Sequence, residues 1–196
     1  MTDLRRICVF TGSSPGARSE YLEAARALGR VLVERNYGLV YGGANVGLMA
    51  AIADTVLAHH GQVIGVIPEA LVEKEVVHRG LSDLRIVRSM HERKGLQAEL
   101  SDGFIGLPGG LGTMEELFEV LTWAQLGMHG KPCGLLNVGD YYEHLLAFLD
   151  HVVRERFLKP EHRSMLIVEQ DPNTLLDRFE HYMAPKVDKW LDRSKT

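Results

Sequence analysis

The stretch FIGLPGGLGTMEELFE, residues 104–119, decides the fold of this chain. A short apolar run, Phe104–Leu107, leads into a glycine-rich turn, and the turn leads into a segment that predicts a helix over 113–128. A strand, a tight turn and a helix in this order form the repeating unit of sheets whose strands run parallel. We therefore expect an α/β protein.

The same alternation recurs along the 196 residues, with mostly continuous apolar runs that are typical of parallel strands buried on both faces. The predicted strands are Ile7–Phe10, Leu39–Tyr41, Val63–Ile67, Leu84–Val87, Phe104–Leu107, Gly134–Asn137 and Met165–Val168. The predicted helices are 19–36, 46–60, 90–101, 113–128, 141–156 and 172–184. The short links between them predict one domain over residues 1–184, an open, doubly wound parallel sheet of about seven strands flanked by helices, and then a polar tail, 185–196.

Capping patterns mark several of the predicted helix starts. Ser89–Glu92 and Thr113–Glu116 fit the S/T-x-x-E capping box, and Asp140–Glu143 fits it more loosely. Asp171 precedes Pro172, which favours a cap residue followed by proline at the first helical position. On this interpretation Glu116 has a purely structural role in capping its helix.

Composition restricts the class of protein. The chain is 45% hydrophobic and 24% charged, its net charge is −4, and it contains no basic run, which excludes an extended nucleic-acid surface. No run approaches the roughly 20 apolar residues of a membrane helix, and the N-terminus lacks the apolar segment of a signal peptide. Cys8 and Cys133 lie in apolar runs, which predicts buried free thiols and a cytoplasmic protein. The nine histidines show no convergent ligand spacing, so we expect neither a metal nor a cofactor.

Ligands of open parallel sheets bind beyond the carboxyl ends of the strands, where the glycine-rich turn lies. Gly109, Gly110 and Gly112 leave backbone N–H groups uncovered, and the following helix adds its own N–H groups and the positive end of its dipole. Thr113 adds a hydroxyl. The turn lacks the lysine of a P-loop and the spacing of the dinucleotide fingerprint, so it predicts a site for a single phosphate. The alternative is that the glycines only build a tight turn.

A second charged helix start, SMHERK at 89–94, also follows a predicted strand. Arg93 and Lys94 in a first helical turn oppose the helix dipole, which favours an anionic partner, although both could simply face water. The acids Glu115, Glu116 and Glu119 crowd the start of the other helix. They exceed what a cap needs, so we expect one carboxylate to face a sugar and not the phosphate.

SMHERK and PGGLGTMEE together resemble the LOG ("lonely guy") family of cytokinin riboside 5′-monophosphate phosphoribohydrolases, once labelled "possible lysine decarboxylase". The resemblance spans roughly residues 5–180 and includes LLNVGDYY at 135–142. It implies a Rossmann-like fold, a nucleotide substrate, a homodimer as the minimal unit with larger homo-oligomers left open, and Arg93 and Glu116 as the catalytic pair. Substrate contacts are expected at Glu75, Arg93, Lys94, Gly109, Gly110, Leu111, Gly112, Thr113, Met114, Glu115, Glu116 and Thr122, with first-loop contacts at Gly12 and Ser13. Leu111 departs from the tyrosine common in that family.

The resemblance implies hydrolysis of the N-glycosidic bond of an adenine or N6-modified adenine nucleoside 5′-monophosphate. Two other functions stay open. Pyridoxal-phosphate chemistry needs a Schiff-base lysine, for which Lys94, Lys131 and Lys159 are available without a surrounding cofactor motif. A non-catalytic nucleotide carrier or sensor would use the phosphate turn equally well, but would not need Arg93 with Glu116.

Overall fold

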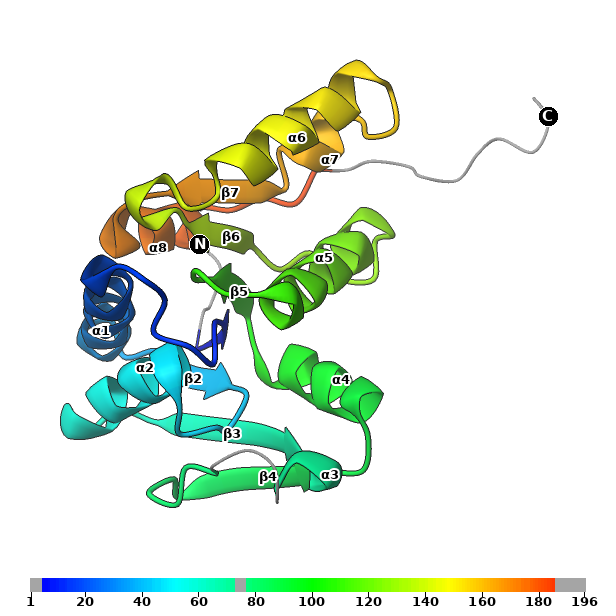
Figure 1. Ribbon diagram of the computed structural model, residues 1–196. Helices are drawn as coiled ribbons and strands as arrows, with labels where there is room; N and C mark the ends of the chain where they lie inside the picture. The colour runs from blue at the N-terminus through cyan, green and yellow to red at the C-terminus, as the bar shows by residue number, and fades with distance from the viewer. Residues whose placement is uncertain (1–4, 73–76, 186–196) are drawn as a thin grey trace.

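The computed structural model describes residues 5–72 and 77–185, and a seven-stranded sheet runs through the middle of this part (Figure 1). Every neighbouring pair of strands is parallel, which confirms the α/β, Rossmann-like prediction. The order across the sheet is β4-β3-β2-β1-β5-β6-β7. The strands are β1 (Arg6–Phe10), β2 (Gly38–Tyr41), β3 (Val63–Pro68), β4 (Asp83–Val87), β5 (Gly103–Gly106), β6 (Cys133–Leu136) and β7 (Leu166–Glu169).

Helices cover both faces of the sheet. The helices are α1 (Ser19–Glu34), α2 (Gly47–Ala58), α3 (Glu69–Val72), α4 (Met90–Leu100), α5 (Leu111–Gln125), α6 (Glu143–Arg154), α7 (Pro160–Arg163) and α8 (Pro172–Glu180), with a 3₁₀ turn η1 (Val138–Asp140). α1, α2 and α8 pack on one face, whereas α4, α5 and α6 pack on the other (Figure 1). The order of the strands reverses between β1 and β5, so a ligand site is expected beyond the carboxyl ends of these two strands.

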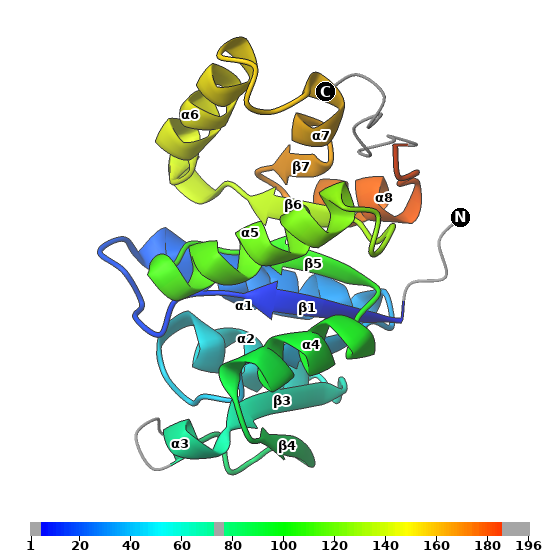
Figure 2. The same ribbon diagram turned by 90° about the vertical axis from the view of Figure 1, so that its right-hand side faces the viewer.

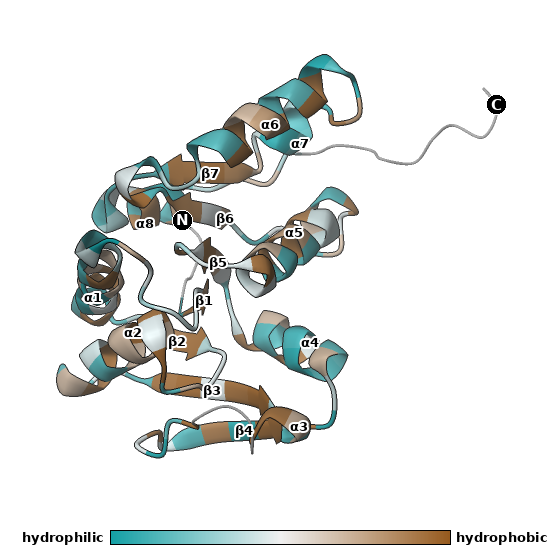
Figure 3. Ribbon diagram, viewed as in Figure 1, coloured by the Kyte–Doolittle hydropathy of each residue, from teal (hydrophilic) through white to brown (hydrophobic). Residues whose placement is uncertain are grey.

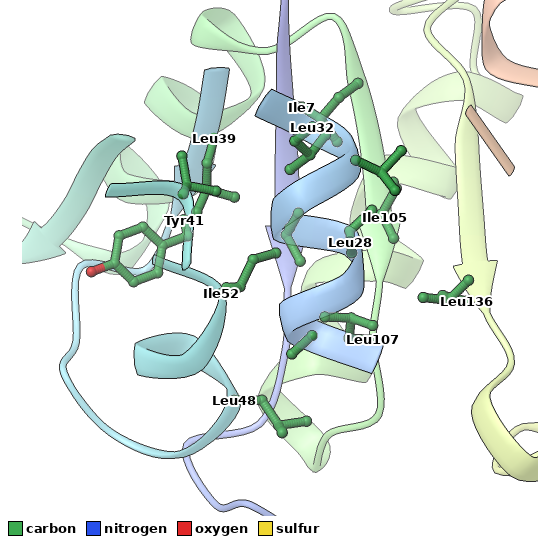
Figure 4. Packing of buried hydrophobic residues seen from close by; sticks show 14 of the residues in the cluster. Ile7, Leu28, Leu32, Leu39, Tyr41, Leu48, Ile52, Ile105, Leu107 and Leu136 are labelled. Atoms are coloured by element: carbon green, nitrogen blue, oxygen red, sulfur yellow. The ribbon is translucent and has the colours of Figure 1, made fainter. Parts of the chain in front are cut away.

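Two hydrophobic clusters hold the layers together, one on each face. Figure 4 shows the first cluster, in which Leu28 and Leu32 of α1 pack with Ile7 and Ile105 of the sheet. All four side chains are fully buried. Figure 3 shows β3 and β7 as mostly brown, whereas α1 alternates between brown and teal. Continuous apolar strands and one-sided helices are what a sheet covered on both faces requires.

The helix starts test the capping predictions. Ser89 caps α4, because its Oγ accepts the Glu92 N–H at 3.1 Å, and Asp171 caps α8 by accepting the Thr174 N–H at 2.9 Å. The Thr113–Glu116 prediction is wrong, because α5 begins two residues earlier, at Leu111. The Asp140–Glu143 prediction is also wrong, since α6 begins after Tyr142 without a side-chain cap.

Other differences are confined to short elements and helix ends. Three elements, α3, η1 and α7, were not predicted, because with four, three and four residues they show too little periodicity to detect. The predicted helix 172–184 ends at Glu180. Of the predicted tail 185–196, all but Pro185 lies outside the described residues. Among the described residues, none of the helices is long and apolar enough to cross a membrane.

Cys8 and Cys133 are buried free thiols, as expected. Burial raises the pKa of both, and that of Cys133 rises from 9.0 to about 12. At neutral pH this corresponds to roughly a thousandfold less of the reactive thiolate.

We expect Ellman's reagent to modify neither thiol of the native protein within minutes, and both at once after unfolding in urea. Rapid modification of the folded protein would contradict the burial, and Cys8→Ser and Cys133→Ser variants would identify the thiol responsible.

Candidate active site

A cavity of about 330 Å³ lies at the carboxyl ends of β1 and β5, at the point where the strand order reverses. Figure 2 shows α4 and α5 side by side in front of the sheet, with β1 visible between them. The cavity is lined by residues at the ends of β1 and β2, by the glycine-rich turn and by residues of α2, α3, α4 and α5. The lining residues are Val9, Phe10, Thr11, Gly12, Ser13, Gly42, Met49, Leu71, Met90, Arg93, Gln97, Gly110, Leu111, Gly112, Thr113, Glu115 and Glu116.

Hydrogen bonds fix the glycine-rich turn between two other loops. The Gly12 N–H and the Thr11 hydroxyl both donate to the Pro108 carbonyl, at 3.1 and 3.3 Å. From the other side, the Tyr141 hydroxyl donates to the Gly109 carbonyl at 2.7 Å. The turn therefore has a set position before any ligand arrives, and preorganised N–H groups bind an anion with less loss of entropy.

The three glycines of the turn have different surroundings. A Cβ at Gly109 would collide with the Thr113 hydroxyl and lie 2.8 Å from the Gly12 nitrogen, so glycine is needed there for close packing. A Cβ at Gly110 or Gly112 would meet no protein atom within 4 Å, and neither residue has a positive φ. A tight turn therefore does not require these two glycines. They line the cavity and leave their backbone open to it.

α5 begins where the turn ends, with Gly110 at the N-cap position. The first-turn N–H groups of Leu111, Gly112 and Thr113 have no carbonyl of the same helix to bind. Together with the helix dipole they form an anion-binding end, and the Thr113 side chain is buried beside it. The Leu111 side chain is 90% exposed and leaves the backbone of the turn accessible.

Arg93 of α4 and Glu116 of α5 meet inside the cavity. Arg93 Nη2 lies 3.4 Å from Glu116 Oε1, and both residues are only 8% exposed. Gly42, directly after β2, makes room for the guanidinium, because a Cβ there would collide with Nη2. Glu116 lies in the second turn of α5, which is not a capping position, and its carboxylate pairs with Arg93.

Lys94 has a different pair of carboxylates. Its ammonium donates to Glu115 at 2.5 Å and to Glu119 at 3.0 Å. Burial alone would lower the pKa of Lys94, but the hydrogen bonds and negative charges of the two carboxylates raise it above its usual value. Arg93 and Lys94 are buried and pair with carboxylates of α5, so the alternative in which both face water is wrong.

The structure brings most of the predicted site residues together. Gly12, Ser13, Arg93, Gly110, Leu111, Gly112, Thr113, Glu115 and Glu116 all line the cavity. Lys94, Gly109 and Met114 lie beside it without lining it. Thr122 lies elsewhere, in a groove between α5, α6 and α7, and its hydroxyl donates to the Phe118 carbonyl at 2.7 Å. Glu75 lies outside the described residues.

Sequence reasoning missed several lining residues. Met90 lies in the quoted charged stretch, and Gly42 in a loop that follows a predicted strand, but neither received a role. Gln97 follows Arg93 by four residues and therefore lies on the same face of α4, a spacing that could have identified it. Among the described residues, no three His, Cys, Asp or Glu side chains are grouped to hold a metal ion.

The arrangement combines an anion-binding helix end with a buried carboxylate one helical turn away. Such a site can hold a phosphoester by its phosphate and present Glu116 to the sugar that carries it. Arg93 fixes the position of that carboxylate and balances its charge.

Known proteins that act on a nucleoside monophosphate are similar to this chain in sequence. The family model described as "possible lysine decarboxylase" matches residues 49–179. The chain is 50% identical over 179 residues to a probable cytokinin riboside 5′-monophosphate phosphoribohydrolase, LOGL9, of Oryza sativa subsp. japonica, covering 91% of this chain and 79% of that one. It is 48% identical over 178 residues to the phosphoribohydrolase LOG3 of Arabidopsis thaliana, covering 91% and 83%.

Solved structures share the fold at lower identity. A molybdenum cofactor binding protein of Rippkaea orientalis superposes with a TM-score of 0.69 at 22% identity, over 92% of this chain and 98% of that one. A molybdenum cofactor carrier protein of Chlamydomonas reinhardtii gives 0.68 at 18%, over 91% and 96%. These similarities show the fold alone. The sequence relatives and the family model together show that this chain belongs to the LOG family of cytokinin riboside 5′-monophosphate phosphoribohydrolases.

Proposed function

We propose that this chain hydrolyses the N-glycosidic bond of a purine nucleoside 5′-monophosphate, with adenine or an N6-modified adenine as the base, to free base and ribose 5-phosphate. The relatives at about 50% identity carry the name of this activity. The observation that carries the proposal is the buried Glu116 carboxylate, held by Arg93 at 3.4 Å beside an anion-binding helix end. Binding of a nucleotide alone would not require that carboxylate.

In the proposed reaction the substrate phosphate binds the N–H groups of Gly110, Leu111, Gly112 and Thr113. The ribose then lies beside Glu116, one helical turn further along α5. The C1′–N9 bond breaks and its electron pair leaves with the base, so positive charge develops on the sugar as in other glycoside hydrolyses. The Glu116 carboxylate stabilises this charge and takes a proton from the water whose oxygen bonds to C1′. The departing base takes up a proton in return.

The three lysines among the described residues do not fit pyridoxal-phosphate chemistry, although the family description mentions decarboxylation. A Schiff base needs an uncharged amine, but two carboxylates raise the pKa of Lys94 and keep it charged. Lys131 donates its ammonium to the Ala98 carbonyl at 2.7 Å, away from the cavity lining. Lys159 precedes α7 and is exposed.

We also propose that the protein forms a homodimer through the groove in which Thr122 lies. The groove measures about 290 Å³ and is lined by apolar side chains of α5, α6 and the following loop. Phe148 and Phe157 on its rim are 59% and 86% exposed, which is unusual for phenyl groups so close together. We further propose that residues 1–184 act as a single catalytic domain and that the protein is cytoplasmic, since its two thiols are unpaired.

Mutation of Glu116 tests the proposed reaction. Glu116→Gln should keep the fold but lower kcat by about two orders of magnitude or more, because the amide can neither accept a proton nor offset positive charge. Release of adenine from AMP and from N6-prenylated AMP measures the effect. Glu99→Gln, an exposed position on α4, is the matched control. Near-full turnover of Glu116→Gln would show that the carboxylate is not catalytic.

Mutation of Gly112 separates a role of this glycine in phosphate binding from a role in forming the turn. In Gly112→Ala the new methyl group meets no protein atom, so the variant should gain about 0.5–1 kcal/mol of stability as other Gly-to-Ala changes in helices do. The same methyl group would occupy the space of the phosphate, so KM should rise about tenfold or more. Gly95→Ala on α4, also without a neighbour within 4 Å, should gain stability at unchanged KM. If KM of Gly112→Ala also stays constant, the phosphate binds elsewhere.

The proposed homodimer can be tested by its mass in solution. Sedimentation of the purified protein should give twice the mass of the 21.9 kDa chain. Phe157→Asp should shift the equilibrium to monomer, because a charge replaces apolar contact area, whereas Ile86→Asp at the other edge of the sheet should not. A monomeric wild-type protein at micromolar concentration would rule out this interface.

A further inference from the structure

Gln97 carries a buried amide that has no hydrogen-bond partner in the part of the chain that the structure describes. The residue is 1% exposed, and neither Oε1 nor Nε2 has a hydrogen-bond partner among the described residues. Leaving such a group unpaired lowers the stability of the folded protein. A core position would normally hold an apolar side chain instead, so the amide needs an explanation.

The position of Gln97 indicates what it faces. It lines the same cavity as Arg93 and Glu116. Gln97 follows Arg93 by four residues on α4. It therefore lies about 6 Å further from the N-terminus of that helix than Arg93 does. Gly112 and Glu116 have the same spacing on α5. Along the two helices the cavity therefore presents, in this spatial order, an anion-binding helix end, the Arg93–Glu116 ion pair and the Gln97 amide.

This sequence of groups matches the parts of a nucleotide. With the phosphate at Gly112 and the ribose at Glu116, the base is the part that reaches Gln97. The carboxamide edge offers one acceptor and one donor side by side and parallel. The N7 and N6–H edge of adenine offers an acceptor beside a donor and is therefore complementary to both.

We propose that Gln97 is the residue that selects a 6-aminopurine base, an inference that rests on the proposed function. Nε2 donates to N7, and Oε1 accepts from N6–H. A 6-oxopurine presents two acceptors on this edge, which leaves Oε1 unpaired and opposes binding. A substituent on N6 that turns towards N1 leaves one N6–H for Oε1, so a modified adenine keeps both contacts. Met49, Leu71 and Met90 are the apolar groups of the cavity wall available to such a substituent.

The test measures binding without turnover. Dissociation constants of AMP, 7-deaza-AMP and IMP are determined by calorimetry on Glu116→Gln and on the double variant Glu116→Gln/Gln97→Met. Methionine has a similar length but lacks both polar atoms. We expect Glu116→Gln to bind AMP about tenfold to a hundredfold tighter than 7-deaza-AMP, which lacks N7, and than IMP. In the double variant the preference for AMP over 7-deaza-AMP should fall to within about twofold.

Leu96→Met on the same helix, which packs in the core without lining the cavity, is the matched control and should keep the preference. The melting temperature of the Gln97→Met variant should stay constant or rise, since an unpaired amide is removed. Gln97→Leu is a second apolar variant should methionine disturb the packing. An unchanged preference in the apolar variants, or none in Glu116→Gln itself, would overturn the inference. Failure of the proposed function is separate, because the wild-type enzyme would then release no base from any nucleotide.

Discussion

The ion pair between Arg93 and Glu116 joins the two helices that form the wall of the cavity. Each side chain is 8% exposed, and burying either charge alone would cost several kcal/mol. Each therefore needs the other. Because they belong to different helices, the pair exists only when α4 and α5 lie side by side on one face. The crossover from β4 to β5 produces that arrangement, since it carries α4 back over β3, β2 and β1. The charge balance of the site thus depends on the topology of the whole sheet.

The strands could be predicted because most are continuous apolar runs, and a run of that kind is a local property of the chain. The starts of α4 and α8 could be predicted for the same reason, since Ser89 and Asp171 bond groups three residues away. The strand order could not be predicted, because apolar runs contain no information about which neighbours they choose. The carboxyl ends of the strands still pointed to the site, since parallel strands end at one edge in any order.

The predictions that failed concern residues whose partners are distant in sequence. Thr113–Glu116 fits the capping pattern, but Gly110 begins the helix earlier and Arg93 binds the carboxylate. The alternative in which Lys94 faces water failed because its partners, Glu115 and Glu119, belong to another helix. The spacing from Arg93 places Gln97 on the same face of α4, but its role could not be predicted, because one sequence does not distinguish an amide facing a cavity from one bonded inside a core.

Several residues of the cavity lower the stability of the folded protein. Gly112 stands inside a helix where alanine would be better by about 1 kcal/mol, and no protein contact requires it. Gln97 leaves two polar atoms unpaired at a buried position. Arg93 and Glu116 place charges where an apolar pair would pack at least as well. Chance does not bring all of these exceptions to one cavity at the reversal of strand order. A ligand with an anionic end and a polar edge explains them together, because its contacts satisfy the groups that the fold leaves open.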